Sequence, residues 1–402
     1  MTLFEMRMAQ LRMPHVDLSS LNRLDERLLA QCDGLATAAE HGQRLLENEF
    51  ESPTRGGAFA LTALAIEGRD LETLDRLFSL AGDTPLVADG LTNAFGWVEP
   101  RHLQGVVRGL LQHEDPRRRA VGLATGASHR VNPGLETSSW LSDPAPTVRA
   151  RALQTAGDLG LTGLAAACVA AMADEDEECQ FWGTQSAVLL GNRDSALDGL
   201  RRIAMDTIAP YRERAFRLTL QALDTPASHG MLQDLAKNST ERRWLIQGSG
   251  IVGDSTYVPW LIGHMPNSST ARLAGEAFTL VTGADLDALQ LWKPEPEDFE
   301  SGLGDDPADE NGDLDPDEGL MWPDQQRVEK WWSANSHRFQ AGQRYFMGKP
   351  VTWEHCIDVL KHGYQRQRVL AAHYLCLLRP GTPLFNTTAP AWRQQRLLAK
   401  MS

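Results

Sequence analysis

A repeat of about 31 residues runs through the middle of this 402-residue chain. Five small residues, each closing a helix-like segment, mark it at intervals of 31, 31, 31 and 30 residues: Gly160, Gly191, Ala222, Gly253 and Gly283. Such a period is typical of repeat proteins, in which each unit buries its apolar face against its neighbours. Chance alignment of the glycines, which are common in this chain, is the alternative. The pattern favours an array of repeats, and a binding surface rather than an active site.

The segments between these marks have the features of helices. Asp115-Pro116-Arg117 and Asp143-Pro144 each place an acidic residue before a proline, an arrangement typical of a helix start. Apolar residues in the flanking stretches recur at helical spacing, and no stretch alternates with period two over a useful length. The residues therefore predict an all-α solenoid of helical hairpins.

One segment sets the charge of the whole protein. Residues 295–318 hold twelve acidic side chains and no Lys or Arg, whereas the net charge of the chain is −14. The other 378 residues therefore carry a net charge of only −2. The segment is also rich in glycine and proline and poor in apolar residues, so it is expected to be a mobile loop.

These patterns divide the chain into four parts. We expect an N-terminal helical cap over 1–56, a repeat array over 57–290, an acidic mobile loop over 291–322 and an aromatic-rich helical segment over 323–402. The N-terminus lacks the features of a signal peptide, and no run of 18 apolar residues is present, so we expect a cytoplasmic protein. The five cysteines form no C-x-x-C pair, which favours buried free thiols over a zinc site.

Four segments resemble a family of bacterial HEAT-like-repeat proteins found beside type VI secretion genes in proteobacteria. They are LDERLLAQCDGLATAAEHG (24–42), DPAPTVRARALQTAGDLG (143–160), SAVLLGNRDSALDGL (186–200) and WWSANSHRFQAGQRYFMGKPVT (331–352). The similarity runs from about residue 20 to 400, and the last segment is its most specific part. The resemblance implies an α-solenoid and a role around secreted toxins, as an immunity protein or an effector-loading adaptor. It implies no catalytic residues, and the acidic insertion is outside the shared pattern.

The sequence contains few residues in patterns typical of catalysis or metal binding. The chain contains no H-E-x-x-H, G-x-S-x-G or P-loop motif, and its eleven histidines have no ligand spacing. Residues 313–319 are similar to a calcium loop, but the glycine is one place late and no closing glutamate follows. We therefore expect neither catalysis nor a cofactor nor a metal. The arginines of the array are expected to pair with carboxylates of neighbouring repeats, with ligand contact as the alternative; they are Arg117, Arg118, Arg119, Arg149, Arg151, Arg212, Arg214, Arg242 and Arg243.

We therefore predict an immunity protein that binds a type VI toxin effector and neutralises it by occlusion. Acidic residues would attract a cationic surface, such as the phosphate-binding groove of a nuclease toxin. The alternatives are a solvated linker for the acidic loop, and an adaptor or a HEAT-like DNA-repair protein for the chain. The near-neutral array argues against nucleic acid, and no membrane partner is expected. Trp331 and Trp332 serve either as a core anchor or, in part, as a partner contact. The predicted partner-binding residues are Glu297, Asp298, Glu300, Asp305, Asp306, Asp309, Glu310, Asp313, Asp315, Asp317, Glu318, Trp331 and Trp332.

Overall fold

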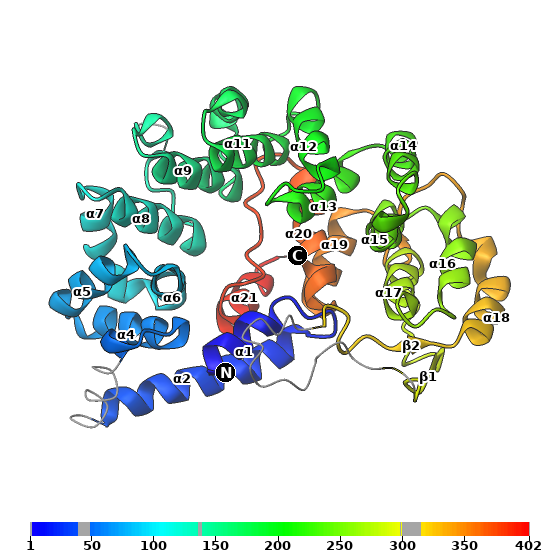
Figure 1. The fold of residues 1–402 in the computed structure, drawn as a ribbon, viewed down its shortest axis with the longest axis horizontal. Coiled ribbons are helices and arrows are strands. Elements are labelled where there is room, and N and C mark those ends of the chain that lie inside the picture. The colour runs from blue at the N-terminus through cyan, green and yellow to red at the C-terminus, as the bar shows by residue number, and fades with distance from the viewer. Residues whose placement is uncertain (1, 39–48, 136–138, 298, 300–314, 402) are drawn as a thin grey trace. The chain divides into compact units, whose positions relative to one another are not determined.

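A computed structural model describes residues 2–38, 49–135, 139–297, 299 and 315–401 of the protein. Most of these residues lie in helices, which confirms the all-α prediction (Figure 1). The described chain divides into two compact units. Within the described ranges, unit 1 comprises residues 2–11, 18–196 and 379–401, and unit 2 comprises residues 12–17 and 197–378. These bounds differ from the predicted ones, because residues after 378 return to unit 1.

Unit 1 is built from helices that follow one another in short steps. Its helices are α1 (Leu3–Gln10), α2 (Leu18–Thr37), α4 (Arg55–Gly68), α5 (Leu71–Ala81), α6 (Pro85–Trp97), α7 (Val106–Leu111), α8 (Pro116–His129), α9 (Pro146–Asp158), α10 (Ala165–Ala170), α11 (Glu177–Leu189) and α21 (Ala391–Leu398). The 3₁₀ turns between them are η1 (Pro100–Leu103), η3 (Trp140–Ser142), η4 (Thr162–Leu164) and η5 (Ala171–Ala173). In this unit α4, α6, α8, α9 and α11 each pack on the next, while α5, α7 and α10 cover them. The core is therefore continued from one helix pair to the next.

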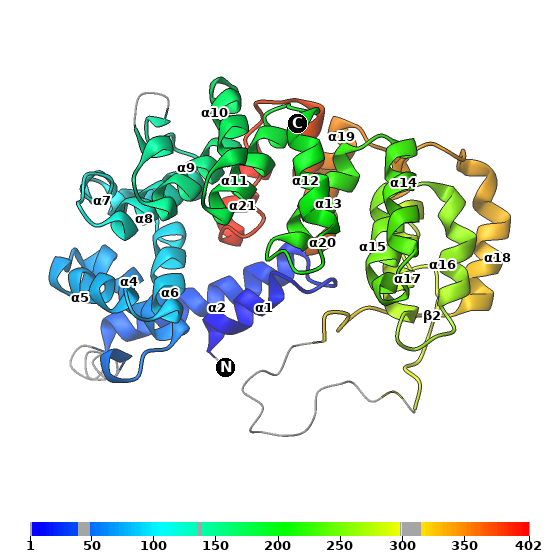
Figure 2. The same cartoon turned by 45° about the horizontal axis from the view of Figure 1, so that its top comes forward.

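Unit 2 repeats this arrangement with α13, α15 and α17 as the consecutively packed helices (Figure 2). Its helices are α12 (Ser195–Met205, which begins at the end of unit 1), α13 (Arg212–Ala222), α14 (Thr225–Ala236), α15 (Arg242–Val252), α16 (Val258–His264), α17 (Ala271–Thr282), α18 (Gln325–Asn335), α19 (Trp353–His362) and α20 (Gln365–Leu378), with the 3₁₀ turns η6 (Ser239–Glu241), η7 (Ser255–Tyr257) and η8 (Ser336–Arg338). Two short antiparallel ladders complete it: β1 (Trp292–Lys293) with β2 (Trp322–Pro323), and β3 (Tyr345–Phe346) with β4 (Lys349–Pro350).

Of the two helix starts predicted from Asp-Pro pairs, the first is confirmed and the second lies two residues later. Asp115 accepts a hydrogen bond from the Arg117 backbone N–H, and Pro116 is the first residue of α8. Helix α9 begins at Pro146, later than Asp143-Pro144 suggested, because the Asp143 carboxylate accepts from Ala145 N–H in a turn before the helix.

Two arginines of unit 1, Arg119 and Arg149, pair with carboxylates ahead of a later helix as predicted, whereas Arg117 pairs with Asp115 at the start of its own helix. Arg119 of α8 forms a two-pronged ion pair with Asp143, at 3.1 and 3.0 Å, and also donates to the carbonyls that precede α8. Arg149 of α9 does the same with Asp174, at 2.9 and 2.8 Å, and donates to the carbonyl of Asp143. We call these two pairs the arginine ladder. In unit 2, Arg212 pairs with Glu241 at 2.5 Å.

The 31-residue repeat has a physical explanation in the ends of the helices. Gly160, Gly191, Gly253 and Gly283 all have positive φ, between 67° and 107°, and lie just after α9, α11, α15 and α17. A left-handed residue that ends a helix is most often glycine, because a Cβ is strained there. At these glycines a Cβ would also approach later parts of the chain, at Gly381, Pro380, Tyr345 and Met347 in turn.

The C-terminal third of the chain runs over these helix ends, within each unit. In unit 2, Tyr345 N–H donates to Gly253 C=O at 2.8 Å, and Arg344 donates to the carbonyls of Gln221 and Leu223 at the end of α13. In unit 1, Arg393 donates to three carbonyls at the end of α6, at 2.7–3.1 Å. Cationic groups at helix C-termini satisfy unpaired carbonyls and oppose the helix dipole. The surface formed by these helix ends is therefore covered by the chain itself.

None of the helices in the described ranges is long and apolar enough to cross a bilayer.

Candidate protein-interaction site

The two ends of the acidic segment are joined by the β1–β2 ladder, which we call the base of the segment. Strands β1 and β2 pair antiparallel at its two ends, with Trp292 opposite Pro323 and Lys293 opposite Trp322. The Asp324 N–H donates to Leu291 C=O at 2.8 Å and extends this closure by one step. Part of the predicted loop, 291–322, is thus ordered structure that fixes where the acidic residues begin.

Three arginines from three helices hold the returning end of the segment. Arg243 of α15 binds Asp317 with two parallel hydrogen bonds of 2.8 and 2.9 Å. Arg272 of α17 binds the Asp315 carboxylate at 2.7 Å and the Asp317 carbonyl at 3.1 Å. Arg366 of α20 donates to the carbonyl of Pro316. We call Arg243, Arg272 and Arg366 the arginine clamp.

A largely buried glutamate contacts one arginine of the clamp. Glu276, one turn after Arg272 on α17, accepts a hydrogen bond of 2.8 Å from Arg366. Burial raises the pKa of Glu276, and the Arg366 guanidinium opposes that rise only in part. For Asp315, burial alone would raise the pKa, but the Asp317 backbone N–H and the Arg272 guanidinium outweigh it, so the net pKa lies below its usual value. The hydrogen bonds to Asp317 raise the pKa of Arg243. The clamp therefore favours an ionised Asp315.

Aromatic side chains complete the base of the segment. The Arg272 guanidinium carbon lies 4.9 Å from the ring centres of both Phe299 and Trp322, whose own centres are 4.7 Å apart. Arg272 thus contacts the chain on both sides of residues 300–314, at Phe299 and at Asp315. Cation–π contacts of this kind add to the ion pairs that fix the two ends.

Exposed apolar side chains surround the base. Leu289 is 45% exposed, Trp292 37% and Met321 40%, all within or next to the β1–β2 ladder. Exposed large apolar side chains are typical of protein-binding surfaces, and tryptophan is enriched among residues that dominate binding energy. These exposed side chains were not predicted as contacts, because the sequence assigned Leu289 to the repeat array and Trp292 and Met321 to a mobile loop. The isolated W-K and W-P pairs that flank the acidic residues are their only sequence signal.

The predicted acidic site residues fall into three groups. Asp298, Glu300, Asp305, Asp306, Asp309, Glu310 and Asp313 lie outside the described residues. Glu297 and Glu318 are exposed. Asp315 and Asp317 differ from the prediction, because the clamp binds both and Asp317 is only 4% exposed. Two of the aspartates in the calcium-like stretch, Asp315 and Asp317, are therefore arginine acceptors.

The two tryptophans lie on the core side of α18. Trp331 packs edge-on against Phe278 of α17, with ring centres 5.6 Å apart, and Trp332 lies 5.5 Å from Phe339. Both are half-buried against the apolar core of unit 2. Their geometry supports the core-anchor alternative rather than a partner contact.

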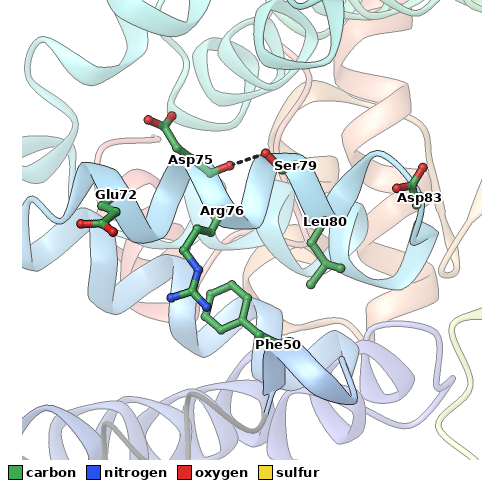
Figure 3. Close-up of a pocket in the computed structure, with 7 residues that line it drawn as sticks. All are labelled: Phe50, Glu72, Asp75, Arg76, Ser79, Leu80 and Asp83. Carbon is green, nitrogen blue, oxygen red and sulfur yellow. Dashed lines mark hydrogen bonds between the residues drawn. The ribbon is translucent and has the colours of Figure 1, made fainter.

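Two shallow cavities lie elsewhere. One, of about 760 Å³, is on α5 in unit 1, where Arg76 stacks on Phe50 at 3.9 Å and Glu72, Asp75 and Asp83 line the rim (Figure 3). The Ser79 hydroxyl there donates to the Asp75 carbonyl. The second, of about 390 Å³, lies between α14, α15 and α16 beside Trp260 and His264. Among their described lining residues, neither cavity pairs a nucleophile with a base.

The cysteines lie in the core rather than at the base of the acidic segment. All five cysteines are free and buried, which confirms the thiol prediction, and burial raises the pKa of Cys168 to about 12. Within the described ranges, no group of three His, Cys, Asp or Glu residues is arranged to hold a metal ion.

Comparisons with protein-family models, curated proteins and solved structures find no match for the chain.

Proposed function

We propose that this chain is a protein-binding solenoid of HEAT-like repeats whose partner is a type VI toxin effector, which it neutralises in the cytoplasm by occlusion. The observation that carries the proposal is the base of the acidic segment. There the β1–β2 ladder and the arginine clamp fix the two ends of a segment whose sequence holds twelve carboxylates, two of them bound by the clamp, beside the exposed Leu289, Trp292 and Met321.

Charge and apolar contact have separate tasks in this proposal. The acidic segment attracts a cationic partner and speeds encounter, which is an effect of long-range charge. The exposed apolar side chains then supply contacts that slow dissociation. A toxin that grips phosphates must be basic, so a nuclease is the effector that fits best.

Covered helix ends direct this proposal away from the array. In repeat proteins the helix ends and inner helices commonly form the binding surface. Here residues 340–350 and 379–394 occupy the helix ends within their own units. The acidic segment, with twelve acidic residues and no Lys or Arg, is the most strongly charged part of the sequence.

The adaptor that loads an effector onto the secretion spike is the second candidate, since the same partner and the same contacts serve it. Pull-down from the producing cell with the full chain should capture the effector, and co-expression of the two in a laboratory host then separates the roles. An immunity protein restores growth of a host that makes the active toxin. Capture without growth rescue supports the adaptor and contradicts the immunity role.

A further inference from the structure

The arginine clamp is filled by three consecutive residues of the chain. Arg243 and Arg272 take the two carboxylates, of Asp317 and Asp315, and Arg366 takes the carbonyl of the proline between them. The two carboxylates have one residue between them in the sequence, and arginines of two different helices bind them. Such convergence on one tripeptide is the geometry of a peptide-binding site with its ligand in place.

We propose that Arg243, Arg272 and Arg366 form a binding site for an acidic peptide that carries two carboxylates with one residue between them. Residues 315–317 are the resident occupant of this site. This site is additional to the toxin-binding role. It receives an anionic peptide, whereas the acidic segment receives a cationic surface.

The site has the chemistry that such a ligand needs. The planar guanidinium of Arg243 matches a carboxylate with two parallel hydrogen bonds, which makes the contact directional as well as strong. Arg272 is 11% exposed, and its Nε–H is buried without a hydrogen-bond partner among the described residues. The present occupant therefore leaves one donor unused. Arg366 also donates to Glu276, so one of the three arginines has a carboxylate partner outside residues 315–317.

The resident occupant, residues 315–317, is part of the same chain, and this tether explains why it stays bound to the clamp. The β1–β2 ladder joins the two ends of the segment, so residues 315–317 remain close to the clamp at a high effective concentration. A separate peptide must compete with this tethered one. A cationic partner that takes up the acidic segment would compete with the clamp for Asp315 and Asp317, and would thereby open the site.

The test uses the full chain and a labelled seven-residue peptide with the sequence of residues 313–319. In the double variant Asp315→Asn with Asp317→Asn the resident occupant is weakened. This variant should bind the peptide at least tenfold more tightly than the wild-type chain, as measured by fluorescence anisotropy at low salt. Adding Arg243→Ala and Arg272→Ala should abolish the gain, and a peptide with asparagine at both aspartate positions should not bind.

Controls keep the result decisive. Glu295→Gln with Glu297→Gln removes two exposed charges from the same segment and should bind the peptide as weakly as the wild type. If the double variant does not fold, Asp315→Asn alone retains the Arg243–Asp317 pair and should show a smaller gain. Equal peptide binding by the wild-type chain and the folded occupant variant would overturn the proposal. So would a gain that survives loss of Arg243 and Arg272.

Discussion

The arginine ladder of unit 1 and the arginine clamp of unit 2 use one kind of bond for two purposes. In the ladder, Arg119 and Arg149 reach carboxylates 24 and 25 residues ahead, just before α9 and α11. In the clamp, Arg243 and Arg272 reach carboxylates 74 and 43 residues away, at the end of an insertion. The ladder pairs connect helices that the fold needs. The clamp pairs position a segment that the helices do not need, so the same chemistry carries a different consequence when lost.

The largest effect is expected where a helix end meets the returning chain. Gly253→Ala places a Cβ on a residue with φ of 72° and against the Tyr345 carbonyl. We expect it to lower the free energy of unfolding of unit 2 by at least about 3 kcal/mol. Hydrogen exchange should speed up in α15 and α17 while α8, α9 and α11 keep their protection.

Gly230→Ala is the matched control for this glycine, because it lies inside α14 with open space around the position of a Cβ. It should leave exchange unchanged or slightly slower. Equal acceleration of exchange in α8–α11 and α15–α17 by Gly253→Ala would contradict independent roles for the two units.

Breaking the ladder should cost more stability than breaking the clamp. Arg149→Ala removes a two-pronged pair with Asp174 and a bond to the Asp143 carbonyl, where the side chains are 18% and 15% exposed. We expect a loss of about 2 kcal/mol in denaturant unfolding, because a partly buried carboxylate is left without its partner. The double variant with Asp174→Ala should recover part of that loss.

Arg243→Ala in the clamp should cost only about 1 kcal/mol. It leaves the buried Asp317 carboxylate without its guanidinium, but Asp317 belongs to an insertion that can leave the clamp and return this carboxylate to water. A loss as large as that of Arg149→Ala would show that the acidic segment is part of the folded core.

The pH dependence of stability should differ in sign between the two regions. Hydrogen bonds from Arg149 lower the pKa of Asp174 below 3.8, so its stabilisation is present above that pH and is lost as the pH falls through the lower folded value. Burial raises the pKa of Glu276 above 4.5, so its contribution is greatest below that pH and is lost as the pH rises through the folded value. Asp174→Asn and Glu276→Gln, compared with wild type by urea unfolding between pH 3 and 7, should therefore diverge in opposite directions. Parallel profiles would contradict this assignment.

Local patterns in the sequence predicted the helices and part of their contacts. The glycines that end α9, α11, α15 and α17 produce the 31-residue spacing in the sequence, and Arg119 and Arg149 pair with carboxylates that precede α9 and α11. These features depend on residues within about one repeat of each other, where spacing carries the information.

Contacts over longer distances could not be read from spacing. Arg272 and Arg366 gave no signal, because their ligands at residues 315–317 come from an insertion that interrupts the repeat. Composition gave 291–322 as one uniform loop, although its two ends are ordered by a ladder and a clamp. The return of residues 379–401 to unit 1 is likewise invisible to local patterns.

The most direct test of the account is the salt dependence of association with the effector captured by pull-down. The decisive variant has amides at Asp305, Asp306, Asp309, Glu310 and Asp313, which leaves the clamp residues unchanged. A control variant carries the same number of amides at exposed positions of unit 1: Glu26, Asp33, Glu51, Glu72 and Glu114.

Stopped-flow association should be at least about tenfold faster at low than at high salt for the wild type and the control, because steering depends on unscreened charge. The loop variant should associate slowly at both salt concentrations. Identical rates and identical salt dependence for the loop variant and the wild type would contradict the claim that the acidic segment recognises the partner.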